Sequence, residues 1–305
     1  MRVLVVGAGA IGGYFGGRLL QAGNDITFLV RPGRSKELAS NGLRIHSPNG
    51  DAFLTRPPTI LAEEINETFD VILLSCKAYD LGDAIKSFAS AVGPNTSIIP
   101  LLNGMKHLDI LDEHFGPDRV MGGLCTIHVT LNEKREVVQL QPAQSFIFGD
   151  RSGKNPERED EIEELVRSGN FNGLASGTIM QDMWEKWVFL SSMAASTCLM
   201  RTSIGNIVAA PGGSDFMIAL IDECKSVAAA YDNFPRAFFV EQKLPLLTSE
   251  GSPLTASMFR DIQAGLRVEA DNVIGDLIAR GEARNVQVPL LRLAYTHLKA
   301  YQPKS

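Results

Sequence analysis

The first half of the chain contains short apolar runs that end at glycine or polar residues. Residues 3–6 form the first run, and the runs DITFLV, FDVILLSCK and NTSIIPLLNG follow it. Apolar runs of this length with such boundaries predict buried strands. A helical pattern that ends at Gly23 lies between the first two runs. The pattern therefore predicts an open parallel sheet with connecting helices.

The apolar pattern changes near residue 178. The segments RVMGGLCTIHV, SFIFGD and GLASGTIMQ predict the last strands, and RSGKNPEREDEIEELV predicts a turn followed by an exposed helix. Beyond them, apolar residues three and four apart predict helices. A chain of 305 residues is long enough for two domains. We predict an α/β protein, with a Rossmann-type parallel-sheet domain over residues 1–178 and an all-helical domain over residues 179–305.

The glycine-rich opening is the first candidate site. The pattern G-x-G-x-x-G occurs at Gly7, Gly9 and Gly12, and the predicted helix begins around Ala10 and Ile11. In a dinucleotide site the three glycines permit a tight turn, close approach to the pyrophosphate and close packing of helix on strand. The phosphates lie at the helix N-terminus, where amide groups are unpaired. A secretion signal would not have six glycines in its apolar core. We therefore predict that these five residues bind a dinucleotide.

Polar residues end the next three predicted strands. Arg31 lies 19 residues after Gly12, where dinucleotide sites normally carry an acidic residue for the ribose hydroxyls. A cation there, with Arg34 close by, favours NADP over NAD. Lys77 and Asn103 end the following strands. Taken alone, Lys77 could equally be a surface lysine and Asn103 part of a plain turn. Ligands, however, bind at the carboxyl edge of parallel sheets, where both residues are expected. We predict that Arg31, Lys77 and Asn103 contribute to the cofactor site.

The helical half contributes Lys186 and Glu269. Lys186 lies between two tryptophans in the apolar stretch QDMWEKWVFLSSMAASTCLM, and a buried ammonium needs a carboxylate, a polar cleft or a path to solvent. Residues 258–281 predict one continuous helix with Ser257 at its start, and Glu269 is a candidate partner for Lys186. A straight helix would separate Ser257 from Glu269 by about 18 Å. Ser257 would then have to lie in a turn that folds back to reach the same small substrate.

Composition and charge narrow the class of protein. The net charge of −6, from 29 Lys and Arg against 35 Asp and Glu, argues against nucleic-acid or anionic-membrane partners. No uncharged stretch is long enough to cross a bilayer. The four cysteines are far apart, which favours reduced thiols and a cytoplasmic protein. The five histidines show no metal-ligand spacing, so we predict no metal site.

Six motifs occur in order over nearly the whole chain. They are GAGAIGGYFG at the start, Arg31, CKAY at Lys77, LNGM at Asn103, WEKW at Lys186 and SMFRDIQAGLRVEAD from Ser257. Together they resemble the ketopantoate reductase family. The resemblance implies NADPH-dependent reduction of a 2-oxo acid, ketopantoate to pantoate in pantothenate and coenzyme A biosynthesis. It implies Lys186 as the catalytic acid, Glu269 as its partner, and Asn103 and Ser257 as substrate ligands. It places Lys77 by the cofactor and substrate, and it leaves a homodimer open.

Four positions depart from the family's pattern. The family typically has asparagine four and eight residues after the lysine, where this chain has Leu190 and Ala194. Val268 stands for the threonine before the glutamate, and Ile274 for the asparagine of a later Asn-Gly. A site that loses hydrogen-bonding groups loses preference for a hydroxylated substrate. Two alternatives therefore stay open: a related reductase for another 2-oxo acid, a 3-hydroxy acid or an imine, and a non-catalytic NADP-binding sensor.

Overall fold

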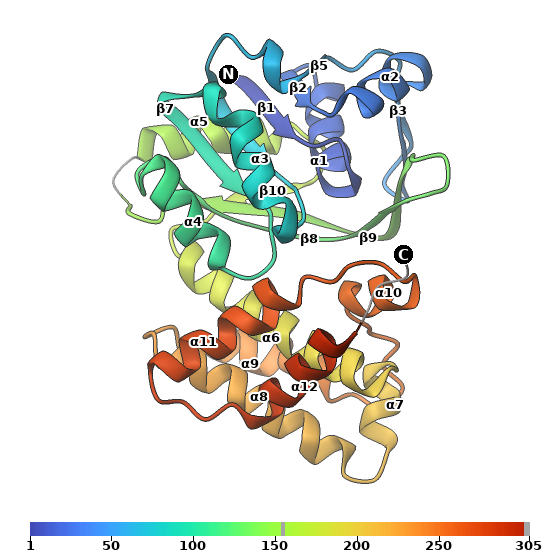
Figure 1. The fold of residues 1–305 in the computed structure, drawn as a ribbon, viewed down its shortest axis with the longest axis vertical. Helices are drawn as coiled ribbons and strands as arrows, with labels where there is room; N and C mark the ends of the chain where they lie inside the picture. Colours follow the sequence, from blue (N-terminus) through green and yellow to red (C-terminus); the bar gives the residue numbers. More distant parts are fainter. Residues whose placement is uncertain (154–155, 302–305) are drawn as a thin grey trace. The chain divides into compact units, whose positions relative to one another are not determined.

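The chain divides into two compact units (Figure 1). The computed structural model describes residues 1–153 and 156–301. The first unit comprises Met1–Leu102 and His107–Ile179, and the second comprises Asn103–Lys106 and the chain from Met180 onward. The short segment Asn103–Lys106 therefore belongs with the helical residues, although it follows a strand of the first unit.

A five-stranded parallel sheet forms the base of the first unit. Its strands are β1 (Arg2–Val6), β2 (Asp25–Leu29), β5 (Thr59–Ile60), β6 (Phe69–Leu74) and β7 (Val92–Pro100). They lie in the order β5-β2-β1-β6-β7, and every pairing is parallel. Both faces of the central strands are buried, which explains their nearly continuous apolar sequences. The Rossmann-type sheet predicted from the sequence is confirmed.

A second sheet joins strands from three parts of the first unit. Its strands are β3 (Leu43–His46), β4 (Ala52–Leu54), β8 (Gly122–Leu131), β9 (Val137–Gly149) and β10 (Asn172–Ala175). β9 pairs antiparallel with β8 and parallel with β3 and β10, and β4 pairs antiparallel with β3. The sequence predicted strands at β8, β9 and β10 but not at β3 and β4. Those two have three or four residues with exposed positions among them, a pattern that a loop also gives.

The helices of the first unit connect and cover these strands. They are α1 (Ala10–Gln21), α2 (Pro32–Asn41), α3 (Leu81–Phe88), α4 (Lys106–Phe115) and α5 (Pro156–Arg167), with 3₁₀ turns at Ala62–Glu64, Ala78–Asp80 and Ala89–Ala91. α1 contacts strands of both sheets (Figure 1). Its Phe15 packs edge-on against Phe146 of β9, with ring centroids 5.5 Å apart. This burial fixes the position of the helix that begins directly after the glycine turn.

The second unit is helical, as the sequence predicted. It contains α6 (Ile179–Met200), α7 (Ile204–Ala209), α8 (Gly213–Ala229), α9 (Ala237–Gln242), α10 (Ser257–Gln263), α11 (Asp276–Ala283) and α12 (Pro289–Ala300), with a 3₁₀ turn at Leu244–Leu247 and a π-helical turn at Asp271–Gly275. Residues 191–198 of α6 are all buried. This long apolar helix forms a large part of the unit's core.

The prediction of one continuous helix over residues 258–281 is wrong. α10 ends at Gln263, and residues 266–269 belong to no helix or strand before the π-helical turn and α11. Gly265 has a φ of +74°, and the amide groups of Gly265 and Leu266 donate to the carbonyls of Ile262 and Asp261. A glycine in this left-handed conformation satisfies the last carbonyls of a helix and ends it. The break removes the straight 12-residue path that separated Ser257 from Glu269.

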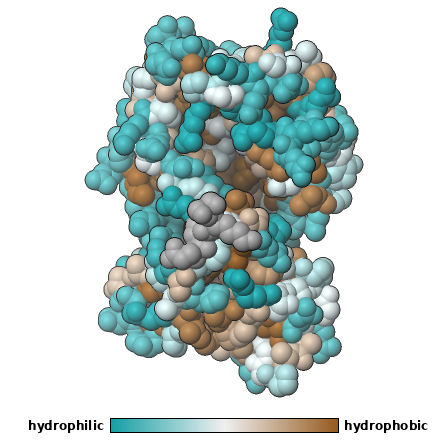
Figure 2. Space-filling model, turned by 45° about the vertical axis from the view of Figure 1, so that its right-hand side comes forward, coloured by the Kyte–Doolittle hydropathy of each residue, from teal (hydrophilic) through white to brown (hydrophobic). Residues whose placement is uncertain are grey.

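The surface carries scattered apolar side chains. Figure 2 shows one face, on which hydrophilic and hydrophobic residues are interspersed. Exposed apolar side chains of this kind are normal for globular proteins. Within residues 1–153 and 156–301, no helix combines the length and the apolar character needed to cross a membrane.

Candidate active site

The glycine turn presents the N-terminus of α1 at the end of β1. Gly7 has a φ of +92°, and its amide donates to the carbonyl of Leu29 at 2.9 Å. A Cβ atom on Gly12 would collide with the carbonyl oxygen of Gly7 and the Ser75 hydroxyl. Gly9, the N-cap of α1, has no heavy atom within 4 Å of the position its Cβ would take. The turn therefore leaves open space beside the unpaired amides of the first helical residues, Ala10 and Ile11 among them. This arrangement fits a dinucleotide pyrophosphate.

Two arginines lie after β2. Arg31 is the N-cap residue of α2, and its side chain is exposed. Arg34 is largely buried, and its Nε and Nη2 donate to the carbonyl of Ala8 at 3.2 and 3.1 Å. Arg34 therefore stabilises the glycine turn through its hydrogen bonds to Ala8, while Arg31 is available to a phosphate group.

Lys77 follows the carboxyl end of β6. It is half-buried and is the N-cap residue of the 3₁₀ turn Ala78–Asp80. Two residues before it, the hydroxyl of Ser75 donates to the carbonyl of Val6 at 3.2 Å. Gly7, Arg31 and Lys77 therefore all follow carboxyl ends of neighbouring strands in the parallel sheet.

Lys186 lies on α6 between two buried tryptophans. Trp184 and Trp187 are only 3% and 1% exposed, and their ring centroids are 5.1 Å apart. Lys186 itself is half-buried. The helix therefore holds a half-buried lysine beside two buried indole rings.

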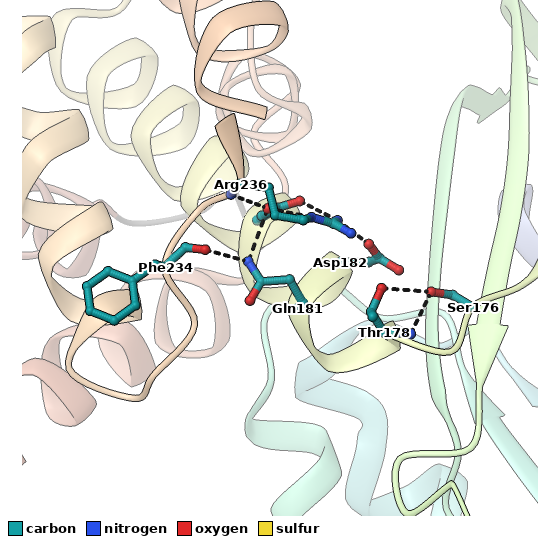
Figure 3. A network of polar contacts seen from close by, with 7 residues as sticks. Ser176, Thr178, Gln181, Asp182, Phe234 and Arg236 are labelled. Carbon is teal, nitrogen blue, oxygen red and sulfur yellow. Dashed lines mark hydrogen bonds and ion pairs between the residues drawn. The ribbon is translucent and has the colours of Figure 1, made fainter. Parts of the chain in front are cut away.

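The turn of α6 before Lys186 is held by Arg236 (Figure 3). The carboxylate of Glu185 accepts hydrogen bonds from the backbone amide, Nε and Nη2 of Arg236 at 2.7, 2.9 and 2.6 Å. Arg236 also pairs with Asp182, and Gln181 donates to the carbonyl of Phe234 at 2.9 Å. Burial raises the pKa of Glu185, but the hydrogen bonds from Arg236 outweigh burial and lower the pKa below its usual value. The network ties the segment before α9 to the start of α6.

The chain that carries Glu269 is hydrogen-bonded to the same part of α6. The carbonyl of Val273 accepts from Trp187 Nε1 at 2.8 Å and from Ser191 Oγ at 3.1 Å. The amide of Val273 donates to the carbonyl of Glu269 at 3.0 Å. Glu269 is half-buried. The structure thus brings the backbone around Glu269 to the turn of α6 that carries Lys186, whereas an ion pair between the two side chains stays a prediction.

Asn103 joins this cluster through its backbone. Its carbonyl accepts a hydrogen bond from the side-chain amide of Asn272, three residues after Glu269. The next residue, Gly104, has a φ of +79°, and a Cβ there would collide with the carbonyl oxygen of Asn272. Asn103 is half-buried, and its own side-chain amide makes no hydrogen bond within the described residues. That amide is therefore available to a ligand.

Ser257 lies beside the later part of α6, away from Lys186. It is the first residue of α10 and is exposed. The amide of the preceding Ala256 donates to Thr197 Oγ1 at 3.3 Å. Thr197 is 11 residues beyond Lys186, a rise of about 16 Å along the helix. Contact of Ser257 with the substrate of Lys186 stays a prediction.

Two sequence profiles of one family cover most of the chain. The profile described as ketopantoate reductase PanE/ApbA matches residues 3–153, and the profile of the C-terminal part of that family matches residues 178–302. The chain belongs to the ketopantoate reductase family. It is therefore an oxidoreductase of a family whose members are NAD(P)-dependent dehydrogenases.

Individual relatives agree with this assignment. An uncharacterized oxidoreductase of Bacillus subtilis is 35% identical over 99% of both chains. The crystal structure of 2-dehydropantoate 2-reductase from Geobacter metallireducens has a TM-score of 0.89 and 25% identity, covering 98% of this chain and 99% of that one. D-mandelate dehydrogenase, solved with NADH and anilino(oxo)acetate, has a TM-score of 0.87 and 19% identity over 98% of both chains, which shows the same fold.

The residues that hold the cluster together were not predicted from the sequence. Asn272, Trp187 and Ser191 link the candidate residues by hydrogen bonds to backbone carbonyls. A buried tryptophan or serine in an apolar helix gives no distinct signal. Asn272 did give one, because asparagine is a poor residue for the interior of a continuous helix. Among the described residues, no group of three or more His, Cys, Asp and Glu side chains could hold a metal ion.

Proposed function

We propose that this protein reduces a 2-oxo acid to a 2-hydroxy acid with NADPH, and that ketopantoate is its substrate, as in pantothenate and coenzyme A biosynthesis. The observation that carries the proposal is the half-buried Lys186 in an apolar stretch of α6. The flanking residues Trp187 and Ser191 are hydrogen-bonded to the segment that carries Glu269. A half-buried lysine beside the residues that anchor the Glu269 segment is a candidate proton donor, which favours a role in chemistry.

The choice of NADPH rests on Arg31. It lies two residues after the end of β2, where an acidic residue would hold the ribose hydroxyls of NAD. Its exposed guanidinium can form a bidentate, charge-assisted contact with the 2′-phosphate of NADP. Gly7, Gly9, Ala10, Ile11 and Gly12 would hold the pyrophosphate, and Lys77 and Asn103 would lie by the nicotinamide end.

The residues of the second unit divide the chemistry between them. When bound, NADPH would supply a hydride to the keto carbon. Lys186 would donate an Nζ proton to the keto oxygen as negative charge develops there, and it would regain that proton from solvent. Glu269 would orient Lys186 and favour its charged form. Asn103 and Ser257 would bind the carboxylate of the substrate.

A second candidate is the reduction of a 2-oxo acid with an apolar side chain. Leu190 and Ala194 lie four and eight residues after Lys186, on the same face of α6. Leu190 is half-buried and Ala194 is 3% exposed. A leucine on this face favours an apolar group, and discrimination against a hydroxyl needs polar partners that these two residues do not provide.

Replacement of Lys186 tests the proposed chemistry. We expect Lys186→Ala to lower kcat for the best 2-oxo acid by about 10²- to 10⁴-fold, because the general acid is lost. The Kd for NADPH, measured by nicotinamide fluorescence, should stay within about twofold. Lys243→Ala, at an exposed lysine after α9, is the matched control. Near-normal turnover by a folded Lys186→Ala variant would show that the acid assignment is wrong.

A further inference from the structure

The π-helical turn Asp271–Gly275 connects the candidate residues of the second unit. Its residues Asn272, Val273 and Ile274 are buried. A π-helical turn is rare and frequently marks a functional site. Here it begins two residues after Glu269, which ends a segment with no regular secondary structure at residues 266–269. Its position makes it the structural link between α6, Glu269 and the Asn103–Lys106 segment.

Three hydrogen bonds hold this turn from two sides. On one side, the Val273 carbonyl accepts from Trp187 and Ser191 of α6, both almost fully buried. On the other side, the side-chain amide of Asn272 donates to the carbonyl of Asn103. The two bonds to Val273 fix the turn to the helix of Lys186, and the bond from Asn272 fixes Asn103 to the turn.

The Asn272 side chain holds the backbone of Asn103 in a closely packed place. The side chain is 6% exposed, so loss of its donor would leave a carbonyl in a part-buried place without its hydrogen bond. Gly104 approaches the backbone of Asn272 too closely for any Cβ atom. The Asn103–Lys106 segment is therefore seated directly on Asn272.

We propose that Asn272 is a positioning residue of the substrate site. Its amide fixes the backbone of Asn103, and thereby aims the Asn103 side chain at the carboxylate of the substrate. Asn272 itself does not contact the reacting atoms. The inference rests on the proposed function, in which Asn103 binds substrate, and it adds the residue that makes that contact possible.

The test is a double-mutant cycle of Asn272 and Asn103. Asn272→Leu has a similar size but no donor, and we expect it to raise the KM for the 2-oxo acid about tenfold or more, with a smaller change in kcat and an unchanged Kd for NADPH. In the Asn103→Ala background, Asn272→Leu should raise KM no further, because there is no side chain left to aim. Amide hydrogen exchange in residues 103–106 should accelerate in Asn272→Leu.

Controls separate positioning from a general structural role. Asn206→Leu removes an exposed asparagine whose amide donates to Thr202 at 2.8 Å, and we expect wild-type kinetics. Asn272→Asp keeps the shape and loses the donor, so it replaces Asn272→Leu if that variant does not fold. Equal KM increases by Asn272→Leu in both backgrounds, or unchanged exchange in residues 103–106, would overturn the inference. A wild type that reduces no 2-oxo acid would overturn the proposed function first, whereas an active wild type with an unaltered KM in Asn272→Leu would overturn the inference alone.

Discussion

Arg31 and Arg34 lie three residues apart, but their surroundings differ. Arg34 donates to the Ala8 carbonyl and pairs with Glu37, and only 11% of its side chain is exposed. The Arg31 side chain is exposed and makes no hydrogen bond within the part of the chain that the structure describes. Arg34 is therefore part of the support of the glycine turn, and Arg31 is the residue to which we assign the choice between the two cofactors.

Arg31→Ala should weaken NADPH binding selectively. Loss of one charge-assisted phosphate contact corresponds to about 1.5–3 kcal/mol, or roughly 10- to 100-fold in Kd. Binding of NADH, which lacks the phosphate, should change less than about twofold. Fluorescence titration with each cofactor measures both constants. Arg34→Ala is the comparison, because loss of the turn's support should weaken both cofactors together. An unchanged NADPH to NADH ratio in Arg31→Ala would show that Arg31 does not bind the phosphate.

Arg236 keeps the buried carboxyl group of Glu185 in its charged form. Glu185 is 5% exposed, and its pKa is lowered by the hydrogen bonds from Arg236 against the opposing effect of burial. A carboxyl whose pKa is lower in the folded state stabilises the fold above its unfolded pKa, and this contribution is lost as pH falls through the folded pKa. The hydrogen bonds between Glu185 and Arg236 should therefore stabilise the fold at neutral pH. Their contribution to the free energy of unfolding should decrease below about pH 4.5.

Arg236→Met should change how the free energy of unfolding depends on pH. At pH 7 we expect the free energy of unfolding to fall by about 2 kcal/mol, because a buried carboxylate loses its charged partner. The difference from wild type should narrow as pH falls towards 4.5, since the stranded carboxyl of the variant then takes up a proton. Urea unfolding at both pH values measures it. Arg292→Met removes a solvent-exposed pair with Glu282 and should cost less than about 0.5 kcal/mol. A pH-independent difference for Arg236→Met would contradict this account of Glu185.

At the scale of elements, the break after α10 decides how Glu269 is placed. Gly265 ends the helix in a left-handed conformation, and residues 266–269, which belong to no helix or strand, then lead towards the π-helical turn. A residue with a Cβ atom pays about 1–2 kcal/mol in this conformation. The position of Glu269 relative to α6 therefore depends on a glycine that makes no contact with substrate in this account.

Gly265→Ala should lower both stability and activity. We expect the free energy of unfolding to fall by about 1–2 kcal/mol and kcat to fall because Glu269 is displaced. Gly82→Ala is the matched control: Gly82 lies in α3, has a negative φ and has open space around its Cβ position. There alanine should be neutral or stabilise by up to about 1 kcal/mol. Urea unfolding and steady-state kinetics on both variants measure these effects. A Gly265→Ala variant as stable as wild type would show that a residue with a Cβ atom is not strained at this position.

The elements differ in how well the sequence predicted them. The strands β1 and β6 are almost fully buried, and β2 and β7 are buried over most of their length, so each left an apolar run. The strands β3 and β4 are short and part-exposed, and residues 258–281 show a helical pattern on both sides of Gly265, so these were missed or misjudged. In the candidate site, Lys186, Glu269 and Asn103 were predicted because their side chains carry chemistry. The Val273 carbonyl that links the Glu269 segment to α6 was not predicted, since a backbone carbonyl has no sequence signal.

At the scale of the whole molecule, the fold supplies local sites for anions in an acidic protein. The net charge is −6, so no overall positive field attracts a nucleotide or a carboxylate. The helix N-terminus after Gly9 and the exposed Arg31 are in the first unit, and Lys186, Glu269 and Asn103 are in the second. The account therefore assigns cofactor binding mainly to one unit and the proton donor to the other.

The most direct test of this account is the initial rate of NADPH oxidation with ketopantoate, run beside unbranched 2-oxo acids and an NADH control. The account predicts saturable turnover of a 2-oxo acid, with kcat/KM at least about tenfold higher for NADPH than for NADH. A preference for ketopantoate would show that Leu190 and Ala194 are tolerated. A preference for an apolar 2-oxo acid would support the second candidate. A folded protein that binds NADPH but oxidises it with none of these acids would contradict the central claim.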